Sequence, residues 1–101
     1  MKFGLKDETI EKIFEVFKKF SQIEEVILYG SRAKGNSKPS SDIDLTLKGE
    51  AISIKELNRI DLVLDDLLLP YKFDLSIYQH IDNPDLIEHI NRVGKVFYKK
   101  D

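Results

Sequence analysis

Three aspartates are the residues of this 101-residue chain with the clearest chemical potential. Asp42 and Asp44 stand two positions apart in an apolar segment, and Asp74 stands in a second segment of the same kind. Side chains two apart on a strand share a face, so a strand over 42–47 would present both aspartates together. Carboxylates gathered on one patch raise one another's pKa unless a cation neutralises them. Mg²⁺ suits such a set, because it prefers oxygen ligands.

A glycine–serine pair, Gly30 and Ser31, stands before the first aspartate with ten residues between. Gly30 follows the apolar run 26–29 and precedes an expected helix start, where glycine lets the backbone turn sharply and approach a ligand. The N–H groups that follow such a turn, together with the helix dipole, favour a phosphate. Ser31 adds a hydroxyl donor. Arg32 and Lys34 add positive charge, and an arginine is able to bind phosphate through two parallel hydrogen bonds.

Each feature alone has an ordinary structural explanation. Two aspartates in this spacing also occur on solvated strand faces, and glycines and charged residues are common where elements end. Two other phosphate or metal motifs do not fit: Asn36–Ser37 stands where a Walker A loop requires Lys–Ser/Thr, and Leu47 stands where an EF-hand loop requires glycine. The combination of a phosphate turn with three carboxylates therefore carries the prediction, rather than any single motif.

That combination is typical of two-metal nucleotidyl transfer, in which one ion holds the attacking oxygen and the other the leaving oxygen. In this scheme Asp42 and Asp44 bridge two Mg²⁺ ions. Asp74 holds the catalytic ion and helps to deprotonate the acceptor hydroxyl.

The elements that must position these residues alternate between helix and strand. Apolar residues at helical spacing predict an N-terminal helix, with Asp7 as its cap. Ser53 and Glu56 have the spacing of a capping box at the start of a long helix, which Pro70 ends. The remaining expected elements are strands over 26–29, 42–47 and 73–78, a short helix opening at 31–34, a last helix from Asn83 and Pro84 to Gly94, and a short terminal strand over 96–98.

The long helix between the second and third strands suits a crossover connection, so we expect segments 42–47 and 73–78 to be parallel neighbours. The fold class predicted is α/β: a small mixed sheet flanked by helices, in the order α-β-α-β-α-β-α. No repeat or linker divides the chain, so we expect one domain over residues 1–101.

Composition narrows the function classes. Hydrophobic residues make up 42% and charged residues 34%, as in ordinary globular proteins, and the net charge of −2 gives no basic excess for nucleic-acid binding. There are no cysteines, which excludes thiol chemistry and disulfides. No signal peptide or membrane-length apolar run is present, so we expect a cytoplasmic protein. Neither His80 nor His89 has ligand spacing, and we expect both to be structural, with Tyr29 in the core.

The segment Leu28–Gly35, Leu-Tyr-Gly-Ser-Arg-Ala-Lys-Gly, followed by Ser-Asp-Ile-Asp-Leu over Ser41–Leu45, resembles the signature of the DNA polymerase β-type nucleotidyltransferases. It is more narrowly similar to the minimal nucleotidyltransferase (MNT) proteins of bacteria and archaea. Their pattern is Gly-Ser, ten residues and Asp-x-Asp, and the later aspartate of the family falls on Asp74. The chain departs from the pattern at Lys34, where the family often has a second arginine.

The resemblance implies the polymerase β-like fold, dependence on Mg²⁺, and transfer of a nucleoside monophosphate from a nucleoside triphosphate, with ATP the expected donor. It also implies a partner, because minimal members are commonly encoded beside a helical HEPN-domain protein and many such pairs act as toxin–antitoxin systems. Two alternatives stay open. One is nucleotidyl transfer to a small molecule, and the other is a non-catalytic module that neutralises its partner by binding.

Overall fold

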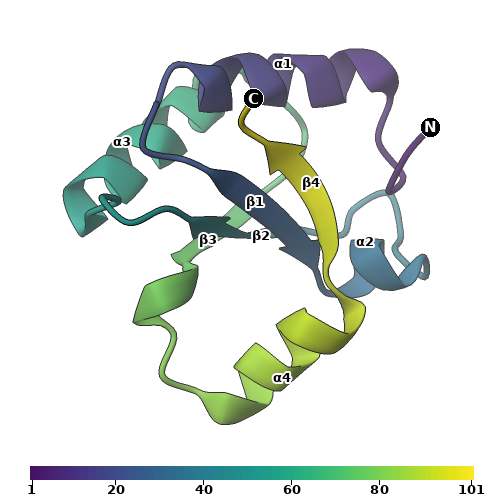
Figure 1. Cartoon of the computed structure of the whole chain (residues 1–101). Coiled ribbons are helices and arrows are strands. Elements are labelled where there is room, and N and C mark those ends of the chain that lie inside the picture. The colour runs from purple at the N-terminus through teal and green to yellow at the C-terminus, as the bar shows by residue number, and fades with distance from the viewer.

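A four-stranded sheet with helices on both sides forms the frame of the protein, in a computed structural model that describes residues 1–101 (Figure 1). The elements begin and end close to the positions that the sequence predicts. In chain order they are α1 (Asp7–Lys18), β1 (Glu25–Tyr29), α2 (Ser31–Lys34), β2 (Ile43–Lys48), α3 (Ile54–Asp65), β3 (Phe73–Ile77), the 3₁₀ turn η1 (Tyr78–His80), α4 (Pro84–Val93) and β4 (Lys95–Lys99).

The strand order is β3-β2-β1-β4, and the sheet is mixed. Strand β2 runs parallel to β3, which confirms the predicted crossover through α3, whereas β1 is antiparallel to both β2 and β4. The expected terminal strand is present as β4. Two strand boundaries differ from the prediction: β2 begins at Ile43, one residue after Asp42, and β3 ends before Tyr78, which starts η1.

The main core lies between one face of the sheet and helices α1 and α3, which share that side in Figure 1. Every second residue of the strands points into this core, and the apolar faces of α1 and α3 pack against those residues. Among its 17 buried members are Ile13 and Phe17 of α1, Ile60 and Leu64 of α3, and Leu45 of β2.

The helix starts follow the predicted capping chemistry with one exception. In α3 the Ser53 hydroxyl accepts the Glu56 N–H while the Glu56 carboxylate accepts the Ser53 N–H, so the capping box is confirmed. The prediction for α1 was wrong. Lys6 occupies the cap position without a side-chain bond, and Asp7 is the first helical residue, where its negative charge still favours the helix dipole.

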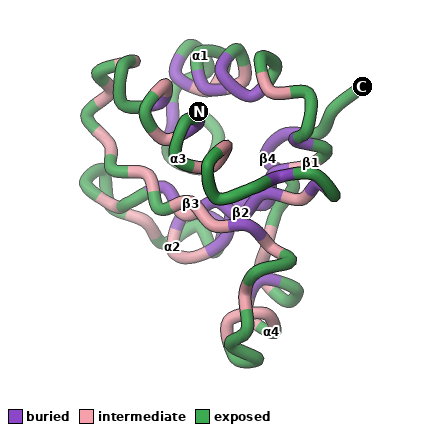
Figure 2. Tube along the Cα trace, turned by 90° about the vertical axis from the view of Figure 1, so that its left-hand side faces the viewer, coloured by how far each residue is buried: buried purple, intermediate pink, exposed green.

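The opposite face of the sheet is covered only in part. Helix α4 packs on β1 through a small cluster in which Ile90 contacts Ile27 and Tyr29. Ile90 is the only fully buried residue of α4, and Figure 2 shows that helix with mostly exposed and intermediate residues. On the same face of β2 and β3, Asp44 is half-buried and Asp74 is exposed, whereas Thr46 is fully buried. None of the helices is long and apolar enough to cross a membrane.

Candidate active site

The three aspartates lie at one end of the partly covered face. Parallel pairing sets Asp44 of β2 directly opposite Asp74 of β3, while their neighbours Ile43 and Leu45 point into the main core. Asp42 precedes β2 by one residue and is exposed, Asp44 is half-buried and Asp74 is exposed. The predicted common face is confirmed for Asp44 and Asp74, because strand alternation and a single register determine it, whereas Asp42 lies outside the strand on which it was expected.

The turn after β1 brings Gly30 against Asp44. Gly30 has a φ of 76° and a ψ of −157°, a conformation that side-chain-bearing residues rarely adopt. A Cβ atom at this position would collide with Asp44 Oδ2. Glycine is therefore required twice here, once for the backbone turn and once for the close approach of the carboxylate. The contact joins the two halves of the sequence motif in space.

Burial and like charge act together on this face. Burial raises the pKa of the Asp44 carboxyl above its usual range, and the charges of Asp74 and then Asp42 raise it further. Burial also raises the pKa of the Tyr29 hydroxyl, which lies on the same face and pairs in register with Asp44. The site is therefore one in which added negative charge is costly and added positive charge is favourable.

The donor chemistry of these residues fits Mg²⁺, which takes carboxylate oxygens and would relieve the repulsion that raises the pKa of Asp44. The geometry is not a ready-made cage. No group of three or more His, Cys, Asp or Glu side chains is arranged to hold a metal ion. Asp44 and Asp74 are the nearest to a paired set, since they occupy matching positions on adjacent strands.

Arg32 lies elsewhere than predicted. The sequence suggested a phosphate ligand, but the side chain is only 2% exposed and its guanidinium donates to backbone carbonyls within the chain. Nε and Nη2 both donate to Ser41 O, at 3.2 and 2.8 Å, and Nη1 donates to Phe3 O at 2.9 Å. The guanidinium also lies 5.1 Å from the ring centroid of Tyr71. Arg32 therefore fixes the loop that leads to Asp42 and is not available for a phosphate in this structure.

Ser31 and Lys34 remain accessible at the turn. Ser31 is the first residue of α2 and is half-buried, and its carbonyl accepts the N–H groups of Gly35 and Asn36. Lys34 is exposed at the end of the same short helix. Their positions leave the Ser31 hydroxyl and the Lys34 ammonium as the candidate phosphate contacts of α2.

His89 lies at the glycine turn, a position that its place in the sequence does not indicate. The Gly30 N–H donates to His89 Nε2 at 3.3 Å, although the two residues are 59 positions apart in the chain. The imidazole also meets the Tyr29 ring edge to face, with centroids 6.2 Å apart. Ligand spacing gave no signal, because the contact depends on how α4 returns to β1.

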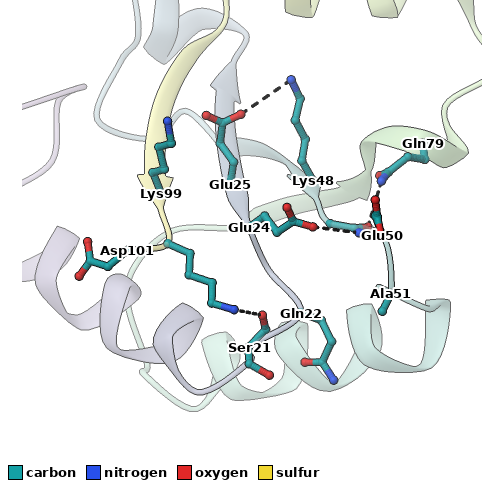
Figure 3. Close-up of a pocket in the computed structure, with 12 residues that line it drawn as sticks. Ser21, Gln22, Glu24, Glu25, Lys48, Glu50, Ala51, Gln79, Lys99 and Asp101 are labelled. Atoms are coloured by element: carbon teal, nitrogen blue, oxygen red, sulfur yellow. Dashed lines mark hydrogen bonds and ion pairs between the residues drawn. The ribbon is translucent and has the colours of Figure 1, made fainter.

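A hollow of about 870 Å³ lies at the opposite end of the sheet (Figure 3). Its lining residue on β1, Glu25, is five residues before Gly30, roughly 17 Å at the usual rise of a strand. Some of its polar groups are paired: Lys48 pairs with Glu25 at 3.8 Å, and Lys100 donates to Ser21 O at 2.9 Å. These pairs are drawn as dashed lines in Figure 3, in which Lys99 and Asp101 make none. The carboxylate face is the better candidate for chemistry.

Comparison with known families agrees with this geometry. The model of the family described as polymerase beta, nucleotidyltransferase matches residues 11–101, which include every residue of the carboxylate face and the glycine turn. No match to the chain was found among curated proteins.

Solved structures resemble the fold at low sequence identity. A chain of a toxin–antitoxin complex with AMP-PNP aligns with a TM-score of 0.72 and 18% identity, over 91% of this chain and 74% of that chain. A chain of the complex between the tri-AMPylated Shewanella oneidensis HEPN toxin and its MNT antitoxin gives 0.69 and 15%, over 95% and 74%. A chain of the MntA–HepT toxin–antitoxin gives 0.68 and 15%, over 94% and 74%. At these identities the likeness is one of fold.

Proposed function

This chain belongs to the polymerase β nucleotidyltransferase family, and we propose that it transfers a nucleoside monophosphate, AMP from ATP, to a hydroxyl group of a HEPN-type partner protein. The observation that carries the proposal is the contact between the glycine turn and the carboxylates. Gly30 lies against Asp44, and Asp44 lies opposite Asp74. A phosphate bound at the turn would therefore lie beside the carboxylates that such a transfer requires.

The chain's own residues divide the work as follows. The Gly30 N–H and the Ser31 hydroxyl donate to the phosphates beyond the bond that breaks, and Lys34 adds positive charge. Asp74, the more exposed of the paired carboxylates, accepts the proton of the acceptor hydroxyl as its oxygen attacks the α-phosphorus. Pyrophosphate leaves as the new phosphate ester forms. Arg32 acts at a distance, through the loop that positions Asp42.

Asp42, Asp44 and Asp74 are the residues that would hold Mg²⁺, which when bound neutralises phosphate charge and lowers the pKa of the acceptor hydroxyl. The raised pKa of Asp44 supports this role, because a carboxyl that resists ionisation alone gains most from a nearby cation. We place the reaction in the cytoplasm, where ATP and Mg²⁺ are plentiful.

Two features support a HEPN-type partner as the acceptor. The solved structures of similar fold include a tri-AMPylated HEPN toxin bound to an MNT antitoxin and the MntA–HepT pair. Asp74 is exposed, so a side chain of a partner protein can approach it. We therefore assign this chain the antitoxin role in a toxin–antitoxin pair.

The test is transfer of label from α-labelled ATP to the co-expressed partner in the presence of Mg²⁺. We expect label on the partner with the wild-type protein, and none with Asp44→Asn. Asp85→Asn, an exposed aspartate in the first turn of α4, is the matched control and should label the partner normally. Equal labelling by Asp44→Asn and the wild type would contradict the assignment of the site.

A second candidate function is neutralisation of the partner by binding alone, which the toxin–antitoxin complexes among the structures of similar fold also favour. Partner neutralisation that persists in Asp44→Asn, with a stable complex and no label, would favour this non-catalytic role. Label on a small hydroxylated compound without any protein partner would instead favour a small-molecule acceptor.

A further inference from the structure

The imidazole of His89 occupies the hydrogen-bonding position of the phosphate turn. The Gly30 N–H donates to His89 Nε2 over 3.3 Å, so this ring nitrogen is the acceptor of the turn's N–H. Gly30 has no freedom to offer this N–H elsewhere, because its φ of 76° and its contact with Asp44 determine the orientation of the turn. Any phosphate that receives the Gly30 N–H has to take the place of His89.

The attachment of His89 is suited to exchange. A bond of 3.3 Å between neutral groups is long, whereas a phosphate oxygen would accept the same N–H at a shorter distance and about twice the strength. Ile90 is the only fully buried residue that anchors helix α4 on the sheet, and His89 is half-buried. Release of the imidazole therefore breaks one weak hydrogen bond and the edge contact with Tyr29, without uncovering the main core.

We propose that His89 is a positioning residue of the phosphate turn: it holds the Gly30 N–H in the ligand-free protein and yields it to the triphosphate. The inference rests on the proposed function, since it takes the glycine turn as the phosphate site. The proposal predicts the direction in which the affinity for the triphosphate changes when His89 is replaced. Because binding must displace His89, removal of the acceptor nitrogen strengthens triphosphate binding, whereas removal of a phosphate ligand would weaken it.

Two variants of similar size separate these roles. His89→Leu removes the acceptor and keeps an apolar side chain against Tyr29, while His89→Gln keeps an acceptor oxygen at similar reach. Both residues are favourable in a helix interior. In the leucine variant we expect water to replace His89 at the half-buried Gly30 N–H. The phosphate of the triphosphate then displaces that water at little cost in free energy. His80→Ala, at the exposed histidine of η1, is the matched control.

The experiment is calorimetric titration with the α,β-methylene analogue of ATP and Mg²⁺, since its α–β bond cannot be cleaved. We expect His89→Leu to bind about 2- to 10-fold more tightly than the wild type, which is what loss of one neutral competing hydrogen bond gives. His89→Gln and His80→Ala should stay within about twofold of the wild type, the spread allowed for independent sites. In ¹⁵N-labelled wild-type protein, the Gly30 amide resonance should shift when the analogue binds.

Two outcomes separate the inference from its premise. If the wild type binds the analogue but His89→Leu binds equally or more weakly, or the Gly30 amide does not respond, the role of His89 is wrong and the proposed function stands. If neither the wild type nor any variant binds the analogue while all remain folded by circular dichroism, the phosphate turn is misassigned. In that case both the role of His89 and the proposed function are wrong.

Discussion

Replacing Arg32 by lysine tests how the loop before Asp42 is held. The guanidinium is 2% exposed, and its nitrogen atoms make two short bonds, Nη2 to Ser41 O at 2.8 Å and Nη1 to Phe3 O at 2.9 Å. Two weaker bonds reach Ser41 O at 3.2 Å and Pro39 O at 3.4 Å. Lysine keeps the charge but offers a single compact donor group in place of the planar fork.

The magnitude follows from those bonds. A hydrogen bond that involves a charged group contributes about 1.5–3 kcal/mol, and a lysine ammonium can reach one of the two main acceptors but not both. We therefore expect Arg32→Lys to lower the free energy of unfolding by about 2–3 kcal/mol. Arg32→Ala leaves both carbonyls unpaired and loses the stacking on Tyr71, so it should cost about 3–6 kcal/mol, twice the loss of one hydrogen bond to a charged group. Either loss is a large fraction of the roughly 5–15 kcal/mol that holds a typical domain folded.

Urea unfolding followed by circular dichroism measures this loss, provided that the slope of the transition is unchanged. Arg59→Lys, at an exposed arginine of α3, is the matched control and should change the unfolding free energy by less than about 0.5 kcal/mol. An Arg32→Lys protein as stable as the wild type but weaker in triphosphate binding would refute the structural role. That result would return Arg32 to the phosphate contacts that the sequence suggested.

Three further predictions follow from the same geometry. Gly30→Ala should abolish transfer and cost about 1–3 kcal/mol of stability, measured by urea unfolding, because φ is positive and the new Cβ meets Asp44. Asp44→Asn should abolish transfer yet raise the thermal midpoint at neutral pH. The pKa of Asp44 is higher in the folded than in the unfolded protein, so ionisation of this carboxyl destabilises the fold. The stability advantage of the variant should therefore shrink as the pH falls through the folded-state pKa. Burial, and then the charge of Asp65, likewise raise the pKa of Asp61 on α3. Asp61→Asn should therefore raise the midpoint at neutral pH in the same direction while transfer is unchanged, and equal midpoints at pH 7 would contradict this.

Periodicity and strand alternation were sufficient to predict the frame of the site. The sequence between the second and third strands contains a capping box at Ser53, a long amphipathic helix and Pro70. A helix of this length favours a crossover connection, and that connection makes the two strands parallel neighbours. Once the two strands pair in register, that register alone places Asp44 and Asp74 on the same face. These are local rules, and the structure follows them.

The contacts of Arg32 and His89 join segments that are distant in the sequence. Arg32 looks like a solvent-facing cation beside a phosphate turn, but the carbonyl of Phe3 comes from far outside the motif in sequence, and the loop folds back so that Ser41 meets the same guanidinium. His89 reaches Gly30 only because α4 returns across β1. Neither contact has a spacing rule, since both are set by where two separately formed elements come to rest.

Comparison of ATP labelled at its α- and γ-phosphates tests the central claim most directly. In parallel reactions with the wild-type protein, Mg²⁺ and the partner, nucleotidyl transfer by the carboxylate face predicts that α-label appears on the partner. The γ-label should be recovered only as pyrophosphate, and Asp44→Asn should yield neither product. Recovery of γ-label on the partner would mean phosphoryl rather than nucleotidyl transfer, and would contradict the account.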